Sequence, residues 1–175
     1  MSSGSFQISY KISSLGALDG KDARELPLMD ITNYSLQGEL EIAADDSKMV
    51  LVEVPLLEVF HAIRQVLEIV PLFTGVMAYA QMFREARTIF TVENDLILIE
   101  HKEIPQLRAR SGSERVSGSY VGFCTSFGAS AKSFVRELEK VAPSLFSDEK
   151  TAAQFANLFV GVKIKDVDPD AYSIV

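Results

Sequence analysis

The sequence predicts an α+β fold in which a mainly antiparallel sheet of about five to seven strands packs against two or three helices. Two observations support this prediction. Apolar and polar residues alternate in several short segments, as in half-buried strands, and apolar residues recur at helical spacing in other segments. Because strand segments follow one another without an intervening helix, an antiparallel sheet is favoured over a doubly wound one.

The N-terminal third predicts three strands. Residues 6–12 alternate apolar with polar side chains and form the first strand. Residues 14–33 mix glycines, a proline and charges, which indicates a long loop with room for one short helical turn. Alternation resumes over 36–42 and 50–54, and the turn-forming cluster at 45–48 between them predicts an antiparallel hairpin.

Pro55 opens the clearest helix of the chain, because the first N–H groups of a helix have no intrahelical partner in any case. Apolar residues recur at helical spacing from Leu56 to Val70, and Pro71 ends the run. Residues 72–83 fit a short core helix, a buried strand or an interface segment, and the sequence leaves these alternatives open.

A second hairpin is predicted for residues 86–93 and 96–101 around the turn Asn94-Asp95. Residues 96–99 are apolar on both faces, as expected of a central strand that is covered on both sides. The polar stretch 102–119 fits a flexible loop or an exposed edge hairpin.

The C-terminal third predicts two further helices. One is expected from about Ser130 to Leu145, and the other follows Ser147, a good N-cap residue. Residues 162–165 fit a final short strand, and the chain from about 166 is expected to be loose. Because no repeat or long linker divides it, we expect 1–175 to form a single domain.

Composition narrows the class of protein. The net charge of −7 and the pI of about 4.9 repel phosphate backbones, so we expect no nucleic-acid partner. The lone Cys124 excludes an intramolecular disulfide and a thiolate metal cluster. Residues 1–5 do not resemble the start of a signal peptide, and the apolar stretches within 66–83 are too interrupted for a spanning helix. We therefore expect a cytoplasmic protein with no membrane partner.

The candidate chemical motifs are incomplete. Glu58 and His61 form half of a di-metal Glu-x-x-His site, but no second copy is present. His101 ends a predicted strand and fits a surface residue. Residues 122–126 only partly match a nucleophile elbow, and Cys124 fits a small, buried, inert residue better. We therefore predict no catalytic, cofactor-binding or metal-binding residues, and no cofactor.

Two charged surfaces are candidates for binding a partner. Residues 39–58 carry six acidic side chains and one lysine, and Glu39 and Glu41 share the wet face of one strand as an acidic ledge. Residues 108–115 form a locally basic patch. The candidate partner-binding residues are Glu39, Glu41, Asp45, Asp46, Arg108, Arg110 and Arg115.

The order of elements around Gly38-Glu39-Leu40-Glu41-Ile42 and Val54-Pro55-Leu56-Leu57-Glu58 resembles small acidic bacterial immunity-type proteins of polymorphic toxin systems. The resemblance covers residues 33–70 and rests on pattern. It implies an acidic α+β domain without catalytic residues that neutralises a toxin by binding it.

The leading hypothesis is a non-catalytic cytoplasmic domain with a protein partner, which the resemblance suggests is a basic toxin domain. One alternative is a small enzyme or ligand-binding domain whose pocket includes Glu58, His61, His101 or Cys124. The other is a homo-oligomer in which residues 72–83 form the interface.

Overall fold

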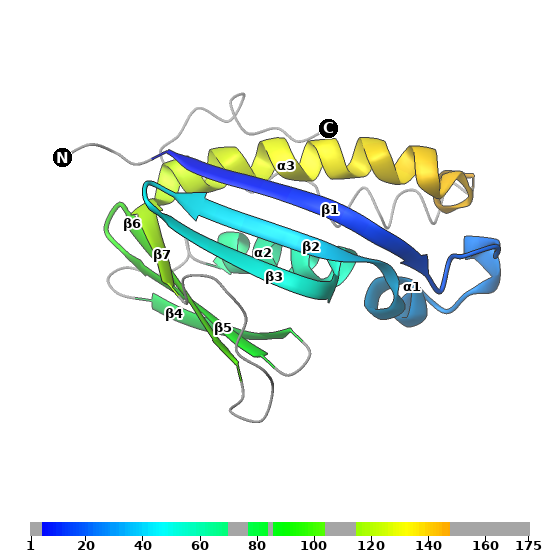
Figure 1. Cartoon of the computed structure of the whole chain (residues 1–175), viewed down its shortest axis with the longest axis horizontal. Coiled ribbons are helices and arrows are strands. Elements are labelled where there is room, and N and C mark those ends of the chain that lie inside the picture. Colours follow the sequence, from blue (N-terminus) through cyan, green and yellow to red (C-terminus); the bar gives the residue numbers. More distant parts are fainter. Residues whose placement is uncertain (1–4, 70–76, 84–85, 104–114, 148–175) are drawn as a thin grey trace.

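The computed structural model describes residues 5–69, 77–83, 86–103 and 115–147. Within these residues the chain forms two antiparallel sheets and three α-helices (Figure 1). The first sheet has the order β1-β2-β3 and the second β4-β5-β6-β7. The strands are β1 (Phe6–Gly16), β2 (Ser35–Ala44), β3 (Ser47–Pro55), β4 (Met77–Phe83), β5 (Ala86–Glu93), β6 (Leu96–Glu103) and β7 (Arg115–Ser119). The helices are α1 (Leu28–Tyr34), α2 (Leu56–Ile69) and α3 (Tyr120–Val141), with short 3-10 turns η1 (Ala23–Glu25) and η3 (Pro143–Phe146).

The predicted α+β class and the antiparallel pairing are confirmed, but the strands form two sheets where one was expected. The physical reason lies in α2. After β3 the chain turns into this helix at Leu56 and packs it against β2 and β3, so the next strand begins a separate sheet. Both hairpins are confirmed, with Asp45-Asp46 and Asn94-Asp95 as their two-residue turns.

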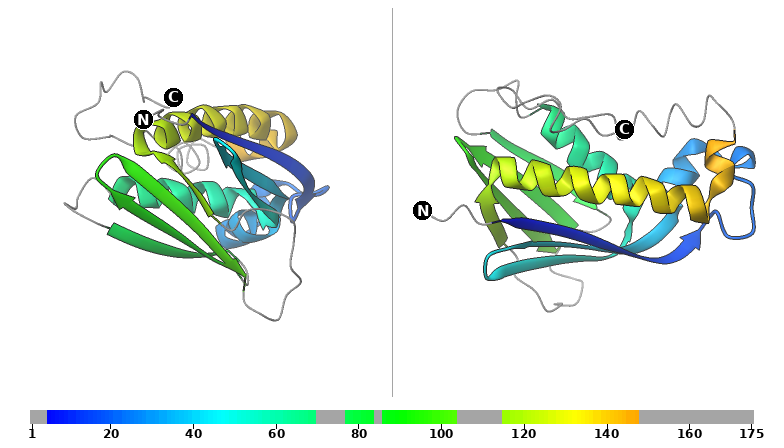
Figure 2. Two further views of the ribbon diagram at one scale, coloured as in Figure 1. Left: turned by 60° about the vertical axis from the view of Figure 1, so that its left-hand side comes forward. Right: turned by 90° about the horizontal axis from the view of Figure 1, so that it is seen from above.

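While α3 packs against β1, helix α2 lies in the interior against β2 and β3 of the first sheet (Figure 2). Its apolar residues are buried around most of its circumference, as expected of a helix with neighbours on several sides. Phe60 is the centre of this packing: its ring stacks on Phe134 of α3 with centroids 4.5 Å apart. The ring also lies 5.8 Å from those of Tyr10 and Phe127. One aromatic cluster thus joins β1, α2 and α3.

Gly38 allows the strands of the first sheet to approach each other closely. A Cβ atom there would lie 2.1 Å from the Lys11 carbonyl oxygen, so no other residue fits without a shift of the backbone. The pairing of β2 with β3 shifts register between Gly38 and Leu40, and Glu53 on the opposite strand has a φ of 54°. The resulting bulge bends β3 just before α2 begins.

Helix α3 begins at Tyr120, not at about Ser130 as predicted, and ends at Val141. Ser119 caps it by accepting a hydrogen bond from the Gly122 N–H, at 3.3 Å. Two glycines in the added part, Gly122 and Gly128, lower its intrinsic helix propensity. Packing outweighs this cost, because the first turns contribute several buried residues to the core. These are Tyr120, Phe123, Cys124 and Phe127.

Some of the remaining predictions fall within the described residues and others fall outside them. The helix predicted to start at Leu56 is confirmed, and part of 72–83 is a strand, β4. Residues 14–33 contain more helix than expected, since both η1 and α1 lie there. The predicted last helix, the short strand at 162–165 and the loose tail lie outside the described residues. Among the described helices, none is both long enough and apolar enough to cross a membrane.

Candidate functional site

The predicted acidic ledge lies on the face of the first sheet that points away from α2, and its charges are balanced by neighbouring lysines. Glu39 and Glu41 are both partly exposed on β2. Lys11 of β1 sits opposite Glu39 in the register. Lys48 of β3 forms an ion pair with Glu41, with Nζ and Oε2 3.0 Å apart. The face therefore carries alternating charges and no net excess of acid over these four residues.

The two acidic hairpin turns lie at the same end of the molecule, where α3 begins (Figure 1). The β2–β3 turn carries Asp45 and Asp46. The β5–β6 turn carries Asp95, and Glu93 precedes it. All four side chains are exposed.

Core contacts hold these two turns close together. Phe6 pairs with Ala44, the last residue before the first turn. The Phe6 ring packs so closely against Gly118 that a Cβ there would lie 2.7 Å from the ring. Gly118 in turn pairs with Ile97, next to the start of β6. An edge contact between Phe6 and Phe123, with centroids 5.2 Å apart, fixes both to α3.

Two apolar side chains are exposed at this end. Leu96, directly after the second turn, is 63% exposed, and Val121 in the first turn of α3 is 37% exposed. A hydrogen bond from the Tyr120 N–H to the Asp95 carbonyl, at 2.8 Å, ties the start of α3 to the second turn. We call the surface formed by Asp45, Asp46, Glu93, Asp95, Leu96 and Val121 the acidic end.

Of the predicted basic patch, Arg115 lies within the described residues, whereas Arg108 and Arg110 lie outside them. Arg115 begins β7 and pairs in register with Glu100 of β6. Its Nη2 donates to Glu100 Oε1 at 2.6 Å and its Nε donates to the same oxygen at 3.2 Å. Because Ser119 at the other end of β7 pairs with Leu96, the arginine and the acidic end lie at opposite ends of the second sheet.

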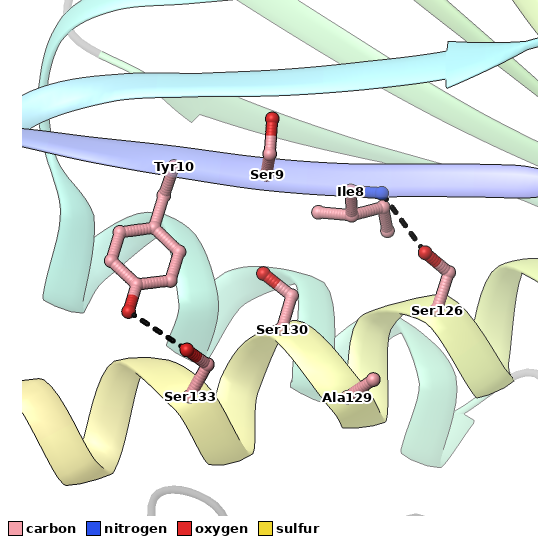
Figure 3. A pocket seen from close by; sticks show the side chains of 7 residues that line it. All are labelled: Ile8, Ser9, Tyr10, Ser126, Ala129, Ser130 and Ser133. Atoms are coloured by element: carbon pink, nitrogen blue, oxygen red, sulfur yellow. Dashed lines mark hydrogen bonds between the residues drawn. The ribbon is translucent and has the colours of Figure 1, made fainter.

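A groove of about 390 Å³ runs between β1 and the middle of α3, and the sequence analysis did not predict it. Two contacts between β1 and α3 border it (Figure 3). The Ile8 N–H donates to Ser126 Oγ at 2.9 Å. Further along, the Tyr10 hydroxyl donates to Glu137 Oε2 at 2.7 Å and lies 3.3 Å from Ser133 Oγ. Burial, aided by Glu137, raises the pKa of the Tyr10 hydroxyl, so it stays a proton donor.

Ser130 lies in the groove between these two contacts, with its hydroxyl directed toward β1 (Figure 3). The side chain is only 7% exposed, and its oxygen has no hydrogen-bond partner among the described residues. The groove is lined by Ile8, Ser9, Tyr10, Ser126, Ala129, Ser130 and Ser133, none of which carries a charge at neutral pH.

Cys124 is buried, as predicted, but it lies within α3, which was expected to begin only at about Ser130, and the surrounding chain is not a nucleophile elbow. An elbow places its nucleophile on a sharp turn between strand and helix, whereas Cys124 lies in the helix, beyond its N-cap. Burial raises the pKa of the thiol to about 12, although the neighbouring Tyr120 hydroxyl opposes part of the shift. The reactive thiolate is therefore suppressed at neutral pH.

The two histidines lie on different elements and do not form one site. His61, on α2 near Glu58, has its Nε2 3.0 Å from Gln65 Nε2. His101, on β6, has its Nδ1 2.9 Å from the hydroxyl of the buried Thr88. Across the described residues, no three His, Cys, Asp or Glu side chains are grouped so that they could hold a metal ion.

Comparison of the chain with family models, with curated proteins and with solved structures found no match. The resemblance of residues 33–70 to immunity-type proteins therefore stays a prediction. Function is inferred below from the geometry of the acidic end and of the groove.

Proposed function

We propose that this domain is a non-catalytic protein-binding domain and that the acidic end is its contact surface. The observation that carries the proposal is the exposure of Leu96 and Val121 at the end that also presents two acidic turns. Apolar side chains bordered by charge are typical of protein contact surfaces, in which apolar anchors supply most of the affinity.

The charges define the kind of partner. The β2–β3 turn with Asp45 and Asp46 and the β5–β6 turn with Asp95 lie at one end of a chain with a net charge of −7, and Glu93 precedes the second turn. A basic protein surface would be attracted to this end, and complementary charge mainly accelerates association and selects the partner. The ledge residues Glu39 and Glu41, whose charges are balanced by Lys11 and Lys48, contribute less to this attraction. A toxin domain blocked by an immunity protein would be one partner of this chemistry.

The test begins with a pull-down from the native host, using the full chain as bait. We expect one stoichiometric basic partner. Leu96→Ser should then weaken its binding at least about ten-fold, or ~1.4 kcal/mol, because a desolvated anchor is lost. The matched control is Met29→Ser, which removes another exposed apolar side chain, 70% exposed on α1, and should leave binding unchanged.

Charge is tested separately through kinetics. The double variant Asp45→Lys and Asp46→Lys should slow association several-fold at low salt, and the difference should shrink as salt screens it. Glu139→Lys, an exposed residue near the other end of α3, is the charge control. The proposal would be contradicted if the association rate of the partner changed neither with salt concentration nor with the charge of the acidic end.

A further inference from the structure

The hydroxyl of Ser130 is costly where it lies. It is buried, it faces the groove, and no described residue bonds to it. A buried hydroxyl without a hydrogen bond destabilises a fold. Alanine at this position would allow the same close approach of β1 to α3, would favour the helix more strongly and would carry no such cost. The need for close packing therefore does not explain the serine.

The groove offers hydrogen bonds to a ligand. Ser126, Ser130 and Ser133 share one face of α3, at helical spacings of four and three residues. On the opposite side β1 is an edge strand of its sheet. The Ile8 N–H points away from β2 toward Ser126, so in the alternating pattern of an antiparallel ladder the Ile8 carbonyl and the Tyr10 N–H also point outward. Hydroxyls and backbone groups thus face each other across the groove.

The shape and charge of the groove restrict the class of ligand. The contacts at Ser126 and at Ser133 limit it to about two helical turns, or roughly 10 Å. A compact molecule fits between these contacts, whereas a continuous peptide strand would have to break them. The lining is uncharged, and Ile8, Ala129 and the ring of Tyr10 supply apolar surface beside the hydroxyls. Such a surface suits a molecule with both C–H faces and hydroxyl groups.

From this geometry we infer that the groove between β1 and α3 binds a small, uncharged polyhydroxy compound of about monosaccharide size, with the Ser130 hydroxyl as its central hydrogen-bond partner. A hydroxyl both donates and accepts, so a polyol can pair with Ser130, with Ser133 and with the strand edge at the same time. The inference does not depend on the proposed function of the acidic end.

The test is titration of the full chain, labelled with ¹⁵N, with D-glucose and with myo-inositol, followed by amide chemical shifts. We expect saturable shifts centred on Ile8, Tyr10 and Ser130 with a dissociation constant in the millimolar range. Ser130→Ala should weaken binding about five-fold, and Ser130→Val, which fills the groove, should abolish it. Thr125→Ala removes an exposed hydroxyl from the same helix and should bind like the wild type.

Three other outcomes would overturn the inference. Absence of saturable shifts with both polyols would mean that the groove holds only solvent. Equal binding by wild type and Ser130→Ala would place the ligand elsewhere. A capped alanine, N-acetyl-alanine-N-methylamide, is the competing probe, and saturable binding of this probe alone would assign the groove to peptides. Dispersed amide spectra of every variant would exclude unfolding as the cause of lost binding.

Discussion

Ser130→Ala should make the protein more stable, an unusual result for truncation of a buried residue. The wild-type hydroxyl is 7% exposed and lacks a hydrogen-bond partner among the described residues. Leaving such a group unsatisfied costs about 1–3 kcal/mol. Alanine also exceeds serine in helix propensity by roughly 0.5 kcal/mol in the middle of a helix such as α3. Because the oxygen is itself buried, its removal also loses its packing contacts, which offsets part of this gain.

Together these contributions predict a gain of about 1–2 kcal/mol in the free energy of unfolding. For a chain of 175 residues this corresponds to a rise in Tm of roughly 2–8 °C. The assay is urea unfolding followed by circular dichroism, in which the midpoint should rise while the m-value stays constant.

Thr125→Ala isolates the contribution of the buried hydroxyl. Thr125 is exposed on the same helix, and its hydroxyl donates to the Val121 carbonyl at 2.9 Å, so its removal leaves no buried polar group. The Thr125→Ala variant gains a similar amount from helix propensity, about 0.5 kcal/mol. If Ser130→Ala is no more stable than Thr125→Ala, the Ser130 hydroxyl is satisfied in the wild type and the reasoning is refuted.

Two further predictions concern the core. Phe60→Ala should destabilise the protein by about 3–5 kcal/mol in the same assay, because Phe60 is fully buried and its ring contacts those of Tyr10, Phe127 and Phe134. A decrease in the free energy of unfolding below about 1 kcal/mol would contradict the central position of Phe60 in the core. Cys124 should make stability fall as the pH rises from about 9 to about 12. The folded state holds the thiol proton through this range, while the unfolded state releases it near the ordinary pKa of 9.0. The fall should be less steep in Cys124→Ala, and equal slopes would show that burial does not raise the pKa of the thiol.

Local signals in the sequence were sufficient for the hairpins and for α2. Alternation on both sides of Asp45-Asp46 and of Asn94-Asp95 defines strands that pair with their nearest neighbours in the chain, so no distant information is needed. Pro55 marks the start of α2 for an equally local reason. The division into two sheets depends on which distant strands meet, and an alternating pattern does not encode that choice.

The start of α3 illustrates a different limit. Gly122 and Gly128 argue locally against a helix, and only the burial of residues such as Phe123 and Phe127 against the core outweighs them. The sequence predicts that the helix begins at about Ser130, which leaves Ser126 outside it. The four-residue spacing of Ser126 and Ser130 therefore did not indicate a shared helix face, and the groove was not predicted. The serines are spaced so that they would have shown a polar stripe once the helix was extended to Tyr120.

The acidic end was predicted in part. Asp45 and Asp46 were among the candidate residues because acidic side chains are dense in that part of the sequence. Leu96 belongs to an apolar run, which suggested burial, yet its place beside the turn leaves it exposed while Ile97 and Ile99 are buried. Exposure at a strand end depends on what covers that end, and this is a property of the tertiary structure.

The two proposed surfaces both include residues of α3 but are physically independent. Val121 and Ser130 are nine residues apart on α3, which places them about 14 Å apart along its axis. At physiological ionic strength charges are screened over about 8 Å, and the groove lining is uncharged. Reversing Asp45 and Asp46 should therefore leave polyol binding intact, and Ser130→Ala should leave partner binding intact. Loss of both activities in either variant would indicate damage to the shared scaffold of β1 and α3, so each set of variants serves as a folding control for the other.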